Sequence, residues 1–175
     1  ALVWDLNTKK NTYNLSGDFK YSYINGVEDK KGINSQLNFS ETSGKYRYGV
    51  GADITTKDFD PNDLGLNFET NYYSIYGNTS YRILNPTKYF NSFSANLNVY
   101  SQFQKETGKI QSSSIVFKIN STNKKNHYFG MGFDANPVET FDYYEPRTAD
   151  RFVIKPTKIG GFIYISTNYN NSFAI

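Results

Sequence analysis

Four oxygen-bearing side chains between residues 58 and 69 follow the spacing of a calcium-binding loop. Carboxylate and amide oxygens at these positions can surround a hard cation such as Ca²⁺. The pattern needs glycine at its sixth position, where this chain has Asp63, and Pro61 stiffens the same stretch. These residue types also form an acidic turn without any metal, so we predict that the loop binds no calcium tightly. The four candidate ligands are Asp58, Asp60, Asn62 and Glu69.

Tyrosine, acidic and arginine side chains are concentrated between residues 142 and 151. Tyrosine rings beside acids and arginines can stack on sugars or peptides and hydrogen-bond to them, which would make this stretch a ligand-binding loop. The alternative, which we favour, is that the two arginines pair with Asp142, Glu145 and Asp150 and fold the loop inward as a lid. The candidate residues for either role are Asp142, Tyr143, Tyr144, Glu145, Arg147 and Arg151.

No set of residues has the composition of a catalytic centre. Glu139, Asp142 and Glu145 lie in one stretch, whereas a glycosidase needs two carboxylates held at a set separation across a cleft. Zero cysteines exclude thiol catalysis, disulfides and cysteine metal sites. The single histidine, His127, follows a short lysine-rich turn and is expected at the surface. We therefore expect a protein without enzymatic activity and without a cofactor.

The composition limits the kinds of protein that this chain can be. Its 175 residues match one ordinary domain, but only 38% are hydrophobic, nearly half of those are aromatic, and the mean hydropathy is −0.63. So many aromatic residues are not typical of a disordered chain. A net charge of +3 is too small to indicate a nucleic-acid partner. No apolar run approaches the length of a transmembrane helix.

Apolar and polar side chains alternate through most of the chain. In the first such segment Tyr13, Leu15 and Phe19 alternate with Asn14 and Asp18. This period of two is that of a β-strand with two different faces. The eight segments lie near residues 12–24, 33–40, 46–54, 73–83, 93–104, 112–120, 129–136 and 159–166.

The strand lengths favour an antiparallel transmembrane β-barrel. Strands of about 10 to 13 residues exceed the roughly 5 to 6 of soluble sheets and match the roughly 9 to 11 that cross a bilayer. The alternative is a soluble antiparallel sheet with one solvated face. Charges near strand middles suit a wet lumen, and we expect four cations to set its charge: Lys20, Arg47, Arg82 and Lys118. The apolar parity is expected to face lipid through Tyr13, Phe19, Tyr48, Val50, Ile75, Leu97, Phe117, Phe133 and Ile163.

Connections between the strands differ in length at the two ends. Short polar turns cover residues 41–44, 85–88, 121–126 and 168–172, whereas long connections cover 57–72 and 137–158. Short turns on one side and long loops on the other are typical of the periplasmic and extracellular ends of an outer-membrane barrel. For the longer connection we expect no secondary structure.

Partial strands flank the eight full ones. Leu2, Trp4 and Leu6 alternate with Val3 and Asp5, and residues 173–175 begin another apolar run. We therefore expect residues 1–175 to form a single domain with about eight full strands and two partial end strands. Such a domain would be a segment of a larger barrel.

Several short phrases resemble one known family. They are Asn62–Gly65, Tyr76–Asn78, Ser80–Arg82, Asn96–Asn98, Asp142–Arg147, Ser166–Tyr169 and Phe173–Ala174. Together they resemble the carboxy-terminal barrel of a Bacteroidota outer-membrane family of unassigned function. Its members commonly carry an amino-terminal module like carbohydrate-binding module family nine, which is absent from these residues. The resemblance covers most of residues 11 to 175 and implies a β-barrel fold and a location in the bacterial outer membrane.

Two functions follow as expectations. The first is a porin-like barrel that binds or conducts a solute, such as a glycan or a peptide, through its lumen and long extracellular loops. The second is a barrel that acts as a scaffold subunit of a larger outer-membrane assembly. The expected partners are the lipid bilayer of the Gram-negative outer membrane and either other outer-membrane proteins or a carbohydrate.

Overall fold

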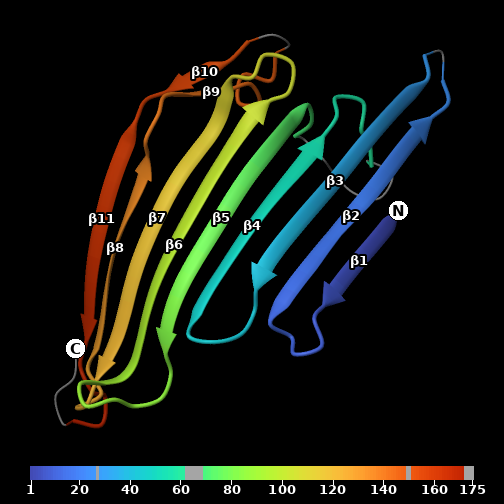
Figure 1. Cartoon of the computed structure of the whole chain (residues 1–175). Coiled ribbons are helices and arrows are strands. Elements are labelled where there is room, and N and C mark those ends of the chain that lie inside the picture. The colour runs from blue at the N-terminus through green and yellow to red at the C-terminus, as the bar shows by residue number, and fades with distance from the viewer. Residues whose placement is uncertain (27, 62–68, 149–150, 172–175) are drawn as a thin grey trace.

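The computed structural model describes residues 1–26, 28–61, 69–148 and 151–171. Nine strands form one antiparallel sheet in the order β1-β2-β3-β4-β5-β6-β7-β8-β11 (Figure 1). They are β1 (Leu2–Asn7), β2 (Tyr13–Ile24), β3 (Lys30–Glu41), β4 (Tyr46–Thr55), β5 (Tyr72–Ile83), β6 (Phe90–Gln104), β7 (Ile110–Asn123), β8 (Tyr128–Asn136) and β11 (Lys158–Ser166). A separate two-stranded hairpin contains β9 (Thr140–Asp142) and β10 (Val153–Lys155).

The predicted all-β antiparallel architecture is confirmed. Each of the eight alternating segments corresponds to one long strand, and β1 is the partial strand before them. The partial strand expected at residues 173–175 lies outside the described residues. Within the part of the chain that the structure describes, no helix is long and apolar enough to cross a membrane.

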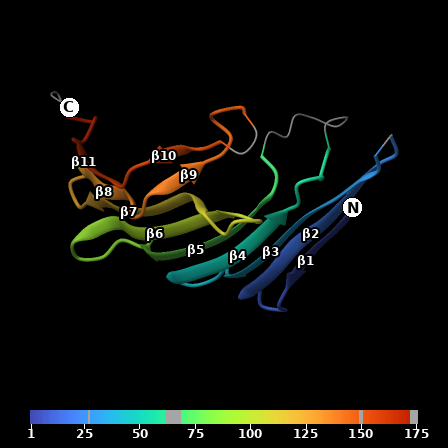
Figure 2. The same ribbon diagram turned by 90° about the horizontal axis from the view of Figure 1, so that it is seen from above.

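The sheet is open in the described residues. Its edge strands, β1 and β11, pair with β2 and β8 respectively and not with each other. Viewed from above, the sheet is curved, and the β9–β10 hairpin lies over its concave side (Figure 2). The observed architecture is therefore a curved antiparallel sheet and not a closed barrel.

Strand register keeps the two side-chain parities on opposite faces of the whole sheet. One row of paired residues crosses all nine strands, and eight of its nine members are apolar side chains, with Gly77 as the ninth. From β1 to β11 the row reads Leu6, Leu15, Phe39, Val50, Gly77, Val99, Ile115, Ala135 and Ile159. Because register follows parity in every pair, the apolar residues form one continuous face. We call it the apolar face and the opposite one the polar face.

The apolar face is exposed. Val50 is 57% exposed, Ile75 is 53% exposed and Ile163 is 68% exposed. Among the described residues, Phe59 is the only buried hydrophobic side chain. All nine side chains that we expected to face lipid share this parity. The sheet consequently has no apolar core of its own, and its hydrophobic surface points outward.

Two connections fold over the polar face. After β4, Phe59 approaches the backbone of Gly32 so closely that a Cβ on this glycine would overlap it. The backbone N–H of Asp60 donates to Ser22 Oγ at 3.1 Å. Further along the sheet, the β9–β10 hairpin packs against β7. The polar face is therefore the one that these connections cover.

The expectation that residues 137–158 lack secondary structure is wrong. In the β9–β10 hairpin Phe141 pairs with Ile154, and the ring of Phe152 packs edge-on against Phe141 with centroids 5.3 Å apart. Lys109 Nζ lies 4.4 Å from the Phe152 ring centroid, within the range of a cation–π contact. Strands of three residues are too short to display a period of two, which is why the alternation did not reveal them.

Candidate functional site

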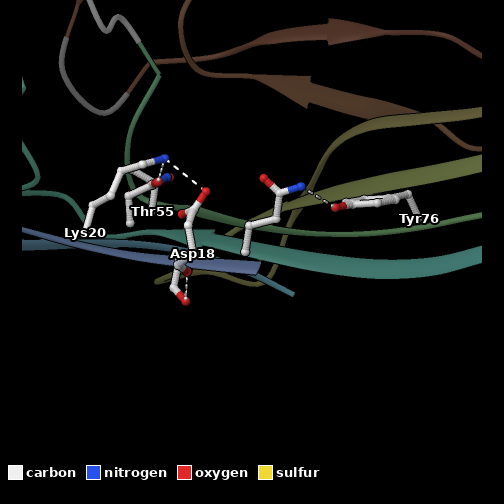
Figure 3. Close-up of polar contacts among 7 residues, drawn as sticks. Asp18, Lys20, Thr55 and Tyr76 are labelled. Carbon is white, nitrogen blue, oxygen red and sulfur yellow. Dashed lines mark hydrogen bonds and ion pairs between the residues drawn. The ribbon is translucent and has the colours of Figure 1, made fainter. Parts of the chain in front are cut away.

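Polar side chains from β2, β3 and β4 form a hydrogen-bonded group on the polar face (Figure 3). Lys20 Nζ lies 3.2 Å from Asp18 Oδ2 and donates to Asn34 Oδ1 at 3.3 Å. Asn34 Nδ2 in turn donates to Thr55 Oγ1 at 2.8 Å, and Thr55 is almost completely buried. Alternation alone places these residues on one face, and the strand register brings them into contact.

A tyrosine on β5 extends this arrangement across the sheet. Tyr76 OH accepts from Gln36 Nε2 at 3.1 Å and donates to Asn38 Oδ1 at 2.5 Å. Its ring lies over Gly51, where a Cβ would overlap the ring. Gly51 on β4 thus leaves the space that the ring of Tyr76 occupies.

All four cations predicted to set the lumen charge lie on the polar face by register. Lys20 is partnered as described above, and Arg47 Nε donates to the carbonyl oxygen of Gly44 at 3.3 Å. Arg82 pairs with Ser94, and Lys118 pairs with Asn96 and Gly132. These cations therefore come from four different strands. Their effect on a lumen stays a prediction.

The candidate calcium loop is only partly described. Asn62 lies outside the described residues, and Asp60 is held through its backbone to Ser22. In the described ranges, no three His, Cys, Asp or Glu side chains are grouped so that they could hold a metal ion. His127 lies at the short-turn end of the sheet, where its Nδ1 accepts from the backbone N–H of Asn168 at 3.1 Å.

The ion pairs of the β9–β10 hairpin differ from those predicted. Lys155 Nζ lies 2.6 Å from Asp142 Oδ2 and 3.2 Å from Glu145 Oε2. Neither Arg147 nor Arg151 pairs with these two acids, and Asp150 lies outside the described residues. Arg147 instead occupies a turn with a φ of 50°. The hairpin places Lys155 beside Asp142, a contact that needed the pairing of β9 with β10 and was not visible in the sequence.

Electrostatics at this ion pair favour the charged forms of both partners. Partial burial alone would raise the pKa of the Asp142 carboxyl. The Lys155 ammonium and the backbone N–H groups of Glu145 and Tyr144 outweigh burial and lower that pKa below its usual value. Hydrogen bonds to Asp142 and Glu145 raise the pKa of Lys155. The Asp142 carboxylate thus accepts hydrogen bonds from three donors and stabilises the hairpin turn.

The two neighbouring tyrosines of the predicted lid have different surroundings. Tyr144 OH donates to the carbonyl oxygen of Thr70 at 2.6 Å, which ties the hairpin connection to the segment before β5. Burial raises the pKa of Tyr144 to about 12, and an interaction with Gln111 opposes this rise. The ring of Tyr143 packs against Phe152 with centroids 5.3 Å apart. Tyr144 is therefore the residue that anchors this connection over the polar face.

A pocket of about 360 Å³ lies between the hairpin and the polar face. Asp142, Tyr144 and Lys155 line it together with Gln102 and Gln111, which are buried. Sequence reasoning missed the two glutamines. Gln102 belongs to the polar parity of β6. Gln111 has no paired residue on β6, because the register between β6 and β7 shifts at this point. No local sequence pattern predicts such a bulge.

The family described as a domain of unknown function, DUF5916, matches the chain over residues 1–175. No curated protein matches the chain, and no solved structure does so.

Proposed function

We propose that this chain, which belongs to the DUF5916 family over residues 1–175, is part of a non-enzymatic outer-membrane β-barrel that binds or conducts a solute. The observation that carries the proposal is the apolar face. It runs across all nine strands of the sheet and has no protein layer over it in the described residues. Soluble monomers rarely expose a contiguous apolar patch larger than a few hundred Å². Lipid chains would cover this face without any further protein.

Strand lengths support the same location. The central strands β5, β6 and β7 contain 12, 15 and 14 residues. These lengths meet or exceed the roughly 9 to 11 residues that a tilted strand needs to cross a bilayer. The additional residues extend past the hydrocarbon and carry the connections away from the lipid.

Aromatic rings gather on the apolar face towards the short turns. Tyr13 stacks on Phe39 with centroids 5.9 Å apart, and Phe39 lies 6.4 Å from Tyr48. On the next strands Tyr81 lies 6.5 Å from Phe93. Tyrosine has an apolar ring and a polar hydroxyl, so it suits the level of the lipid headgroups. These rings support a membrane boundary at the short-turn end, which we assign to the periplasmic side.

The open edges of the sheet require partners under this proposal. Backbone N–H and C=O groups cannot stay unpaired in hydrocarbon, so only a closed barrel is stable there. We propose that further strands pair with β1 and β11 and complete the ring around the polar face. The polar face, with Lys20, Arg47 and Lys118, would then line the interior.

A scaffold role is the second candidate, and one observation favours it. The β9–β10 hairpin lies over the concave side of the sheet (Figure 2), where it would occupy part of the interior of a closed barrel. A barrel filled in this way would conduct little. Its loops would then serve as contacts for other outer-membrane proteins.

The test is insertion and conductance in planar lipid bilayers, with and without the hairpin. In the variant, a short Gly-Ser turn replaces residues 138–156 and joins β8 to β11. We expect the unaltered protein to conduct and the variant to conduct more per channel, because the hairpin no longer obstructs the polar face. Zero conductance in both, with insertion intact, would favour the scaffold. Failure of both proteins to enter bilayers would contradict the membrane assignment.

A further inference from the structure

The pocket under the β9–β10 hairpin has the chemistry of a small-molecule site. Its volume of about 360 Å³ falls at the low end of the roughly 300 to 1,000 Å³ that is typical of such sites. Three of the polar side chains that line it are nearly completely buried: Gln102 is 6% exposed, Gln111 is 7% exposed and Thr140 is 4% exposed. Buried polar side chains need hydrogen-bond partners, and the pocket that these three side chains line can hold a ligand that supplies them.

Hydrogen bonds connect the floor of the pocket but leave capacity for a ligand. Tyr100 OH donates to Gln102 Oε1 at 2.6 Å, and Gln102 Nε2 donates to Gln111 Oε1 at 3.1 Å. Each amide nitrogen has two hydrogens, so Gln102 retains one donor. The Thr140 hydroxyl has no hydrogen-bond partner among the residues that the structure describes. The pocket therefore offers fixed hydrogen-bond donors and acceptors between the hairpin and the polar face.

The charges around the pocket favour a neutral ligand. Lys155 Nζ lies 2.6 Å from Asp142 Oδ2 and 3.2 Å from Glu145 Oε2, so one cation faces two carboxylates at the edge of the pocket. An anion would face this excess of acid. The phenol rings of Tyr100 and Tyr144 add flat apolar surface beside the amides, and that combination suits a ligand with an apolar ring face and hydroxyl groups at its rim.

We propose that this pocket binds one unit of a neutral sugar. The inference rests on the proposed solute-binding role of the polar face and names the class of solute. Gln102, Gln111 and Thr140 hydrogen-bond to the sugar hydroxyls, and Tyr100 and Tyr144 bound its ring. The pocket lies where β6 ends and β7 begins, beside the long connections, so a sugar reaches it from the proposed extracellular side.

The test is saturation-transfer NMR and calorimetry on the protein in detergent. The probes are glucose, galactose, mannose, N-acetylglucosamine, maltose and cellobiose, with glucuronate as the charged control. We expect at least one neutral sugar to bind and glucuronate to bind more weakly. Gln111→Leu should weaken binding about tenfold or more, because a buried amide partner is lost. Thr140→Val, which keeps the side-chain shape, should weaken it less.

The matched control is Gln36→Leu, the same change on the same face outside the pocket, where Gln36 donates to Tyr76. Equal loss of binding in Gln36→Leu and Gln111→Leu would overturn the inference. So would the absence of binding by every neutral sugar when each is tested at about 1 mM, in about 50-fold excess over the protein. Tighter binding of glucuronate than of every neutral sugar would overturn it as well. A protein that conducts but binds no sugar refutes only the pocket. A protein that binds sugar but never enters bilayers refutes only the proposed function.

Discussion

The two faces of the sheet are built from alternate residues of the same strands, yet their side chains differ in exposure and in hydrogen bonding. On the apolar face, side chains such as Val50 and Ile163 are largely exposed and make few polar contacts. On the polar face, Thr55 and Ser74 are 1% exposed, and the Ser74 hydroxyl donates to Asp53. A protein in water usually has the reverse arrangement, with its apolar side chains inside. In this sheet the apolar side chains are exposed and the polar side chains are covered, an arrangement that would suit lipid on one face and water on the other.

The largest expected effect comes from placing one charge on each face. Leu97 and Asn98 are neighbours near the middle of β6 and point to opposite faces. We expect Leu97→Arg to destabilise the refolded protein in lipid by roughly 2 to 4 kcal/mol and Asn98→Arg to cost little. Urea titrations of refolding into vesicles measure both. Equal costs would contradict the assignment of the apolar face to lipid.

A smaller effect is expected from substituting two glycines, Gly51 on the polar face of β4 and Gly77 on the apolar face of β5. Gly51→Val should cost about 1 to 3 kcal/mol, because the added side chain displaces the ring of Tyr76. Gly77→Val is the control, since a Cβ there meets Val99 Cγ2 at an ordinary 3.4 Å. It should be nearly neutral. Unfolding in the same vesicles gives both values, and a greater loss in Gly77→Val would reverse the comparison.

Two adjacent tyrosines, Tyr143 and Tyr144, test how the connection between β8 and β11 is attached to the polar face. Tyr144→Phe loses the hydrogen bond to Thr70 and should destabilise the covering connection by about 1 kcal/mol. Tyr143→Phe should have almost no effect, because Tyr143 packs through its ring on Phe152. Limited proteolysis between β8 and β11 compares the two variants. Faster cleavage in Tyr143→Phe than in Tyr144→Phe would contradict the role of Tyr144 as the residue that anchors this connection.

The smallest effect concerns the pH dependence of the hairpin. Because the pKa of Asp142 is lower in the folded protein, its contribution is complete above the ordinary carboxyl pKa and is lost as the pH falls through the lowered value. The raised pKa of Lys155 adds a contribution that is complete below 10.5 and is lost as the pH rises through the raised value. Lys155 is half exposed, so each loss should stay below about 1 kcal/mol.

Amide exchange of β9 and β10, corrected for the intrinsic exchange rate, follows this transition at acid pH. Asp142→Asn should remove it, whereas Glu145→Gln should reduce it only slightly, because Glu145 is 60% exposed. A transition that persists unchanged in Asp142→Asn would assign it to another group.

Local pattern determined much of this protein. The period of two in residues such as Tyr13, Leu15 and Phe19 predicted the strands and their faces, because side-chain direction in a strand depends only on neighbouring residues. The lengths of the connections similarly predicted which turns lie at which end. Asp142, Tyr144 and Glu145, which we predicted to belong to a lid, lie in the connection that covers the polar face. Their role as a lid stays a prediction.

Tertiary structure alone decided the features that depend on contacts between distant residues. Lys155, rather than Arg147 or Arg151, pairs with Asp142 because three-residue strands bring it there. The register shift beside Gln111 turns two ordinary glutamines into a pocket floor. The open sheet also follows from pairing, since alternation is the same in a flat sheet, a curved sheet and a barrel. A repeat of two residues specifies the direction of each side chain, whereas the partner across the strand is set by the chain as a whole.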